Sequence, residues 1–488
     1  MPVTNGVNAD AQCAPLHFFT LRCATLWHGH WGGIYIFTID EGNIRKAVLH
    51  LSLPAVAEQT LFMIVGVVST VFVGRISKEA ISAVGLVNIL AGFVMVMFVA
   101  LSTGSTVLVA RLMGENDTGT AKQALKQSVV IGAAASLLLS VLLFFCAAPL
   151  IGLLFGRAEA DVVNMAVLYF KITMVTFPLA LVNILISGCL RGAGDTVTPM
   201  LIANIVNVLN VILGIILIFG IKLPFLHING GGIAGAGWAV AISRAVGGIL
   251  SFAMLYRRGN PIKTDLFKNF RFDPELMKRV LKVGIPAAME QIVMQGGFLV
   301  LQVIISGMGT IAIAVYQICM SVNSISYIPI WGFGMGATTL VGQSLGAKKP
   351  HIAEKCGWSA LKIGVAVIIL LTAVIFIFPD KLISIYNSDP DVIGTGAAAI
   401  RIFSLSQPFL AVVVVISGAL RGAGDITYVM ITSFIGIWIF RIMVTIGLNL
   451  AFHLGINGVW IALCADFFIR SIMYFVRFKR GRWKEIAV

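Results

Sequence analysis

Long apolar segments recur along the chain from about residue 44 to residue 478, separated by short polar connections. A helix needs about 20 mostly apolar residues to cross a bilayer. These segments are long enough, and the alternating short strands of a membrane barrel are missing. The pattern therefore predicts an all-α membrane protein with twelve transmembrane helices, at about residues 44–74, 80–112, 123–152, 163–189, 198–221, 232–257, 277–306, 311–342, 355–378, 393–419, 427–451 and 456–478.

The composition excludes a soluble enzyme, a disordered chain and a secreted disulfide scaffold. Apolar residues make up 58% of the 488 residues and charged residues only 11%, against about 25% in soluble domains. The seven cysteines are scattered without a C-x-x-C motif, so we expect neither disulfides nor a zinc site. No Walker motif, metal cluster or converging nucleophile is present, so we expect no enzyme activity and no cofactor.

The net charge of +14 is concentrated in the connections on one side of the predicted spans. With the N-terminus inside, the opposite loops hold little more than Arg75, Lys78, Arg157, Lys222 and Lys381. This asymmetry predicts a multi-pass protein of the plasma (cell inner) membrane with both termini in the cytoplasm. Because the basic loops face an anionic leaflet, they require no nucleic-acid partner.

The chain contains an internal duplication. Residues 187–195 read SGCLRGAGD, and residues 417–425 read SGALRGAGD. LPAVAEQ, with Pro54 and Glu58, matches IPAAMEQ, with Pro286 and Glu290, and ARLMGENDTGTAKQ matches GQSLGAKKPHIAEK. Matches in register predict two parallel six-helix repeats, an architecture of transporters that rock two lobes around a central site.

The duplication divides the chain into five parts. We expect an N-lobe at residues 43–257 and a C-lobe at residues 277–478, joined by a basic cytoplasmic linker at 258–276. Residues 1–42 lack a long apolar run and are expected to be a disordered tail, and residues 479–488 a basic cytoplasmic tail.

The paired PxxxEQ and RGAGD motifs, with YIPIWGFGMGATTLVGQSLGA at 327–347, resemble the multidrug and toxic-compound extrusion (MATE) family over about residues 44–482. The resemblance implies two lobes around a V-shaped cavity. It also implies efflux of cationic amphipathic compounds, driven by inward flow of protons or sodium. The expected partners are small amphipathic molecules, the coupling cation and the bilayer, with the chain acting as a monomer.

Ionisable residues inside the spans are the candidates for ion coupling, because such groups are costly in lipid. Glu58 and Glu290 each lie four residues after a helix-bending proline. A carboxyl group in a low-dielectric site holds its proton more readily, so it can exchange that proton for a substrate. The alternative is a pair of structural carboxylates that hydrogen-bond a bent helix.

Asp466, Arg441 and Arg470 form a second candidate group. Asp466 and Arg470 share a helix face, and Arg441 is within reach from the preceding span. We expect a structural ion pair, with ion coupling by Asp466 as the minority alternative. Aligning the repeats places Arg244 opposite Asp466, so the two lobes are chemically unequal.

The fifth span carries an asparagine stripe, Asn204, Asn207 and Asn210, expected to face the lobe interior. Many members of the MATE family have an aspartate where this chain has Ser69 and another where it has Gly214. Their N-lobe proton site therefore cannot be transferred to this chain.

The remaining candidates are polar, methionine and aromatic residues that could line a substrate cavity, with helix or lipid packing as the alternative role at each position. They are Gln59, Asn207, Asn210, Gln291, Met294, Phe298, Tyr316, Gln317 and Gln407. The RGAGD residues Arg191, Asp195, Arg421 and Asp425 are interpreted either as a cytoplasmic gate or as loop architecture.

These observations lead to one main hypothesis and two alternatives. The main one is a secondary active multidrug exporter that antiports organic cations or other amphipathic compounds against protons or sodium by alternating access. The alternatives are a flippase for lipids or lipid-linked precursors, which predicts a basic cavity, and a channel or membrane enzyme.

Overall fold

The computed structural model describes residues 41–486 except 156–158, 224–225, 258–259, 261, 267–269 and 387–388. Most of the predicted N-terminal tail and parts of the predicted linker lie outside the described residues. Within them, ten helices are long and apolar enough to cross a membrane, and two bent helix pairs bring the number of spans to twelve. The fold is an all-α membrane protein of two six-helix repeats, with one short β-hairpin.

The N-lobe comprises the elements from α2 to α9. They are α2 (Ile44–Gly74), α3 (Lys78–Gly114), α4 (Thr118–Phe145), α5 (Ala147–Phe155), α6 (Ala160–Val175), α7 (Phe177–Gly192), α8 (Val197–Gly214), the π-helix η2 (Ile215–Phe219), the strands β1 (Gly220–Leu223) and β2 (Leu226–Asn229), and α9 (Gly232–Met254). The short 3₁₀ helix η1 (Glu41–Asn43) precedes α2. The strands pair antiparallel, with Gly220 opposite Asn229.

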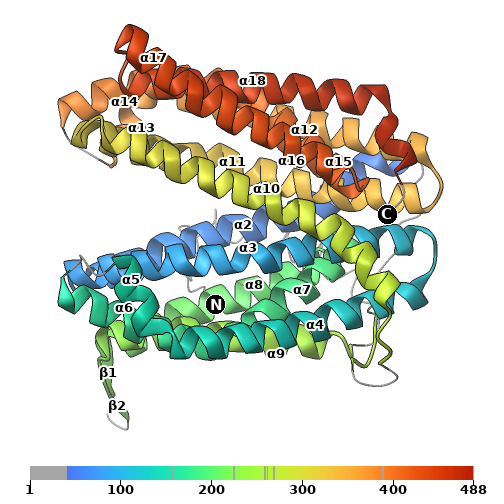
Figure 1. Cartoon of the computed structure of the whole chain (residues 1–488), viewed down its shortest axis with the longest axis horizontal. Coiled ribbons are helices and arrows are strands. Elements are labelled where there is room, and N and C mark those ends of the chain that lie inside the picture. The colour runs from blue at the N-terminus through green and yellow to red at the C-terminus, as the bar shows by residue number, and fades with distance from the viewer. Residues whose placement is uncertain are drawn as a thin grey trace, which may run out of the picture.

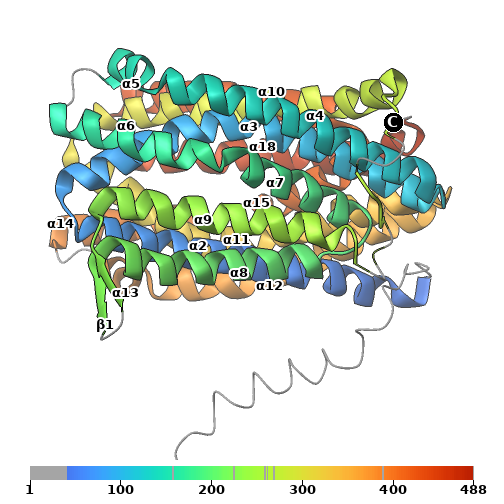
Figure 2. The same cartoon turned by 90° about the horizontal axis from the view of Figure 1, so that it is seen from below.

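The C-lobe repeats this order. It comprises α10 (Pro274–Ser306), α11 (Thr310–Gly346), α12 (Pro350–Ile377), α13 (Pro379–Ser384), α14 (Pro390–Ser404), α15 (Gln407–Gly422), α16 (Ile426–Phe434), the π-helix η3 (Ile435–Met443), α17 (Val444–Phe452), α18 (Ile456–Arg480) and η4 (Arg482–Glu485). Figure 1 shows the two sets of helices as two layers, and Figure 2 shows that the long helices run along a common direction.

The fourth and tenth spans are broken helices. α6 and α7 meet at an angle of 53°, and α14 and α15 at 51°. Pro178 and Pro408 lie in the first turn of α7 and α15, where the missing N–H costs nothing but the preceding helix cannot continue. The sequence-based prediction treated each as one uninterrupted span, although these two prolines occupy equivalent positions in the repeats.

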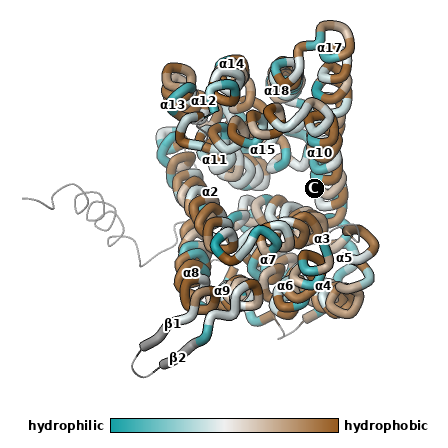
Figure 3. The backbone as a smooth tube through the Cα atoms, turned by 90° about the vertical axis from the view of Figure 1, so that its left-hand side faces the viewer, coloured by the Kyte–Doolittle hydropathy of each residue, from teal (hydrophilic) through white to brown (hydrophobic). Residues whose placement is uncertain are grey.

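The two lobes contact each other through the first two long helices of each lobe. α2 packs along α11 of the other lobe, and α10 packs along α3. Small residues permit the close approach: a Cβ at Gly104 would collide with the carbonyl oxygen of Val280, and one at Gly336 would collide with Ser52. Figure 3 shows the α2–α9 helices on one side of this contact and the α10–α18 helices on the other.

Candidate functional site

Glu58 and Arg191 form an ion pair that joins the first helix of the N-lobe to its RGAGD loop. Glu58 lies on α2, one turn after Pro54, and Arg191 is in the last turn of α7. Arg191 Nη1 lies 3.3 Å from Glu58 Oε1, and both side chains are mostly buried. In this lobe, the predicted coupling carboxylate and the predicted loop arginine therefore meet.

Glu290 and Arg421 form the equivalent pair in the C-lobe. Arg421 donates from Nη2 to Glu290 Oε1 at 2.6 Å and from Nε to Glu290 Oε2 at 3.2 Å. The Glu290 side chain is 5% exposed, against 14% for Glu58. Two donors in a forked arrangement make this pair the stronger of the two.

The aspartates of the RGAGD motifs have partners other than the arginines of the same motifs. Asp195 accepts a hydrogen bond from the backbone N–H of Thr198 at 2.9 Å, at the start of α8. Asp425 binds Arg477 Nε of α18 at 2.7 Å. Each RGAGD arginine thus binds the glutamate on the first helix of its own lobe, whereas Asp195 caps α8 and Asp425 ties its loop to α18.

Main-chain carbonyls of both RGAGD loops accept hydrogen bonds from the opposite lobe. Gln343, near the end of α11, donates from Nε2 to Gly192 O at 2.9 Å, and Thr339 donates to Arg191 O at 3.0 Å. In the other direction, Arg111, near the end of α3, donates from Nη1 to Ala423 O at 3.4 Å. We call these three hydrogen bonds the cross-lobe latch.

The backbones of the two lobes touch beside the latch. A Cβ at Gly114 would overlap the carbonyl oxygen of Gln343, and one at Gly346 would overlap that of Arg111. Three residues after Gly114, the side chain of Asp117 caps the start of α4. The hydrogen bonds from Thr120 lower the pKa of the Asp117 carboxyl group. This end of the bundle, which we call the RGAGD end, is therefore closed by main-chain packing.

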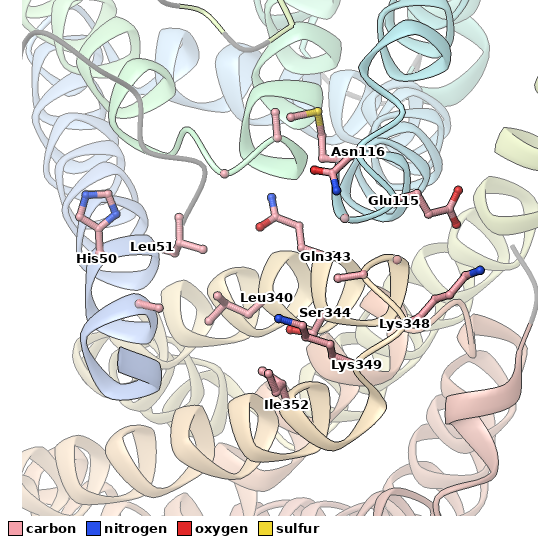
Figure 4. Close-up of a pocket in the computed structure, with 17 residues that line it drawn as sticks. His50, Leu51, Glu115, Asn116, Leu340, Gln343, Ser344, Lys348, Lys349 and Ile352 are labelled. Atoms are coloured by element: carbon pink, nitrogen blue, oxygen red, sulfur yellow. The ribbon is translucent and has the colours of Figure 1, made fainter. Parts of the chain in front are cut away.

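A cavity of about 550 Å³ remains at the RGAGD end. Figure 4 shows His50 of α2 on one side of the cavity and Asn116 of the α3–α4 turn above it. The side chain of Gln343 projects from α11 between these two residues. Lys348 and Lys349 of the α11–α12 turn line its far side. The cavity is bounded by both lobes, so its shape depends on the latch.

Away from the RGAGD end, side chains on the lobe-facing surfaces become exposed. Phe93 and Met97 lie on the same face of α3 as Gly104, eleven and seven residues closer to its start, and they are 47% and 64% exposed. On α10, Gln295 shares the face of Gly284 and is also exposed. Along α3 and α10 the lobes are thus packed together at the RGAGD end, and the side chains beyond it are exposed. Along α2 and α11 the lobes stay in contact past Glu58, where Ser324 Oγ lies 3.5 Å from Met63 Sδ.

Asp466, Arg441 and Arg470 form one buried cluster in the C-lobe. Arg441 donates from Nε to Asp466 Oδ2 at 2.9 Å, and Arg470 donates from Nη2 to the same oxygen at 2.7 Å. The three side chains are 6% exposed or less. Arg441 lies in η3, a π-helical segment that changes the direction of the side chains along this span. One carboxylate serves two guanidinium groups, which leaves a surplus positive charge.

Ser69 and the asparagine stripe form a neutral polar group in the N-lobe. Ser69 of α2 donates to Asn210 Oδ1 of α8 at 3.1 Å. The side-chain nitrogen of Asn207 and the side-chain oxygen of Asn204 are buried without partners. The asparagine stripe therefore faces protein, and two of its polar atoms remain unsatisfied.

The other predicted substrate residues divide into two groups. Gln59, Gln291, Met294 and Phe298 are half-buried, and Gln317 is exposed. Tyr316 is buried against Trp460, and Gln407 is buried and donates to Asn323 Oδ1 at 2.9 Å. Tyr316 and Gln407 thus belong to the packed interior of the C-lobe, whereas the first group is accessible.

Sequence reasoning missed Arg111, Thr339 and Gln343. Their acceptors are main-chain carbonyls, which no side-chain pattern reveals. One signal was available for two of them, because Arg111 and Gln343 are each the second residue of the matched motifs ARLMGENDTGTAKQ and GQSLGAKKPHIAEK.

A protein-family model and several known proteins match this chain over most of its length. The MatE family model matches residues 54–216 and 286–446, so each matched segment begins at the proline of one repeat. The chain is 33% identical to a probable multidrug resistance protein NorM of Thermotoga maritima, over 93% of this chain and 96% of that protein. It is 27% identical to the uncharacterized transporter YisQ of Bacillus subtilis, over 90% and 94%.

Solved structures share the fold. An outward-facing multidrug resistance MATE transporter superposes with a TM-score of 0.82 at 21% identity, covering 91% of this chain and 97% of that one. A transporter of the same superfamily from Pyrococcus furiosus, described as having a binding pocket of reverse polarity, gives 0.82 at 22% identity over the same shares. The chain therefore belongs to the MATE family of multidrug efflux transporters, and it is a multi-pass membrane transporter, not an enzyme.

Proposed function

We propose that the chain exports amphipathic compounds across the plasma membrane in exchange for protons, with the RGAGD end and both termini in the cytoplasm. The observation that carries this proposal is the connection between each glutamate–arginine pair and the latch. Glu58 holds Arg191, whose main-chain oxygen accepts from Thr339. Glu290 holds Arg421, two residues before Ala423, which accepts from Arg111.

Protonation of a glutamate removes its negative charge and releases the arginine. The RGAGD loop then loses one of its anchors, and the latch that depends on the position of that loop weakens. A proton that enters from outside would thus open the cytoplasmic side, where it is exchanged for substrate. Loss of the proton restores the pair, closes the latch around the substrate and opens the opposite side.

A proton suits this site better than sodium. Sodium needs several oxygen ligands, but an arginine occupies both oxygens of Glu290. A proton needs only one oxygen. The arrangement described above, packed at the RGAGD end and exposed beyond it, corresponds to the outward-open, deprotonated state in this cycle.

Reconstituted vesicles that contain the pH dye pyranine test this function. With an acidic interior, external ethidium or taurocholate should cause alkalinisation of the lumen if protons leave as compound enters. We expect this response in the wild type and its loss in the Glu58→Gln/Glu290→Gln double variant. An equal response in the double variant, or a response driven only by a sodium gradient, would exclude the proposed coupling.

A further inference from the structure

Arg244 is a cation in the interior of the N-lobe that no carboxylate of the described residues neutralises. It lies near the middle of α9, on the face opposite the lipid-exposed stripe of Trp238, Ile242 and Ile249. Within the described residues, Arg244 has neither an ion pair nor a side-chain hydrogen bond. Tyr169 of α6 interacts with it electrostatically, but a phenol is neutral at physiological pH.

The C-lobe shows how buried arginines in these helices are neutralised, because Arg441 and Arg470 share the carboxylate of Asp466 there. The exposed residues of α9 match those of α18 when Ser243, not Arg244, is placed opposite Asp466. The N-lobe thus has no carboxylate at this position within the described residues, and its glutamate, Glu58, is already paired with Arg191. An unpaired charge in a membrane interior is costly and normally marks a site where a partner binds.

The neighbouring helix α8 carries a second unsatisfied hydrogen-bond donor close to Arg244. α8 packs beside α9, and Val206 contacts Gly247, so the antiparallel helices place Arg244 within about one turn of the level of Asn207 and Asn210. The amide nitrogen of Asn207 is buried without an acceptor. Arg244 itself remains partly accessible although it lies opposite the lipid face. A guanidinium and an unsatisfied amide N–H both require an acceptor oxygen.

We propose that Arg244 binds the anionic group of the transported molecule, so that the chain carries amphipathic oxyanions in preference to organic cations. This inference rests on the proposed export function and specifies its substrate class. The surplus positive charge of the Asp466 cluster acts in the same direction, because it disfavours a cation in the neighbouring C-lobe. A carboxylate, sulfonate or phosphate accepts from the guanidinium in the geometry that arginine favours.

Equilibrium binding to the purified full-length chain in a neutral detergent tests the proposal without any ion gradient. Radiolabelled taurocholate serves as the amphipathic anion and ethidium as the cation. We expect the wild type to bind taurocholate about tenfold or more tightly than ethidium. Arg244→Gln should weaken taurocholate binding about tenfold or more, and Arg244→Lys should recover most of it. Lys362→Gln, which removes an exposed positive charge from α12, should change nothing.

Competition identifies the source of the anion. Displacement of taurocholate by dihexanoyl phosphatidylglycerol, with the same dependence on Arg244, would assign the site to a lipid headgroup, whereas failure to displace would assign it to a soluble compound. Tighter binding of ethidium than of taurocholate in the wild type would overturn the proposal, and this measurement needs no variant to fold. Unchanged taurocholate affinity in Arg244→Gln would also overturn it. Charge-selective binding without proton-linked transport would contradict the proposed function alone.

Discussion

Arg111 and Gln343 occupy equivalent positions near the ends of the second helix of each repeat, and each donates a hydrogen bond to the RGAGD loop of the opposite lobe. The glycines three residues later are also equivalent, and each packs against the main chain of the other residue's helix. The two repeats thus contribute equivalent donors and equivalent glycines to the proposed cytoplasmic closure. Its two halves differ in strength, because one donor is a guanidinium at 3.4 Å and the other an amide at 2.9 Å.

Gln343→Ala should shift the chain toward the state in which the RGAGD end is open. The substitution removes a neutral hydrogen bond worth about 1 kcal/mol, or roughly a fivefold change in the ratio of the two states. Spin labels at Glu115 and Lys349, exposed residues on opposite sides of the cavity, report this ratio as a distance distribution. An unchanged distribution would show that this hydrogen bond does not hold the lobes together.

Gly346→Ala should prevent closure of the RGAGD end and abolish transport. The added methyl group would overlap the carbonyl oxygen of Arg111, which is main chain and cannot move aside. Gly66→Ala is the matched control, because its Cβ meets nothing within 4 Å and alanine favours the helix. We expect normal export for Gly66→Ala and less than about a tenth of it for Gly346→Ala, at equal yields of folded protein. Normal export by Gly346→Ala would contradict the close-packed closure.

Glu290→Gln should cost more stability than Glu58→Gln. Glu290→Gln leaves the mostly buried guanidinium of Arg421 without its carboxylate, which should lower the free energy of unfolding by about 3 kcal/mol. Glu58→Gln breaks a longer and more exposed pair, which should lower it by about 1 kcal/mol. Thermal unfolding in one detergent compares the two variants directly. The reverse order of midpoints would mean that the pair geometry does not determine their strength.

Asp466→Asn should destabilise the C-lobe strongly, because Arg441 and Arg470 would lose their shared carboxylate in a buried site. Losing one partner of such a cluster costs about 3–5 kcal/mol. Replacing all three residues by apolar ones, Arg441→Met, Asp466→Leu and Arg470→Met, should restore the thermal midpoint. If that variant is stable and still exports, the cluster is structural; if it is stable and no longer exports, the cluster takes part in coupling.

The fold could be predicted from the sequence because the membrane imposes strong constraints. Span length, the basic connections and the duplicated RGAGD motif identify a two-repeat transporter before any contact is known. The bends at Pro178 and Pro408 were missed, because each span remains apolar through its break. Helix packing decides whether a proline ends a span or only kinks it.

The candidate site was predicted only in part. Glu58 and Glu290 stand out as rare intramembrane carboxylates, but their partners Arg191 and Arg421 are more than 130 residues away in the sequence. The local sequence does not show whether each arginine pairs with a distant glutamate or with the aspartate of its own loop. Asp466 was easier to interpret, because Arg470 lies one helical turn away and a buried charge requires a partner.

The distance between spin labels at Glu115 and Lys349, measured as a function of pH, tests the central claim most directly. The labels are introduced through cysteines after the seven native cysteines are replaced. We predict a short distance at high pH in the wild type, and a longer one as the pH falls and the glutamates lose their arginine partners. In the Glu58→Gln/Glu290→Gln variant the longer distance should be present at every pH. A wild-type distance that does not respond to pH, or the same response in the double variant, would contradict the link between the ion pairs and the latch.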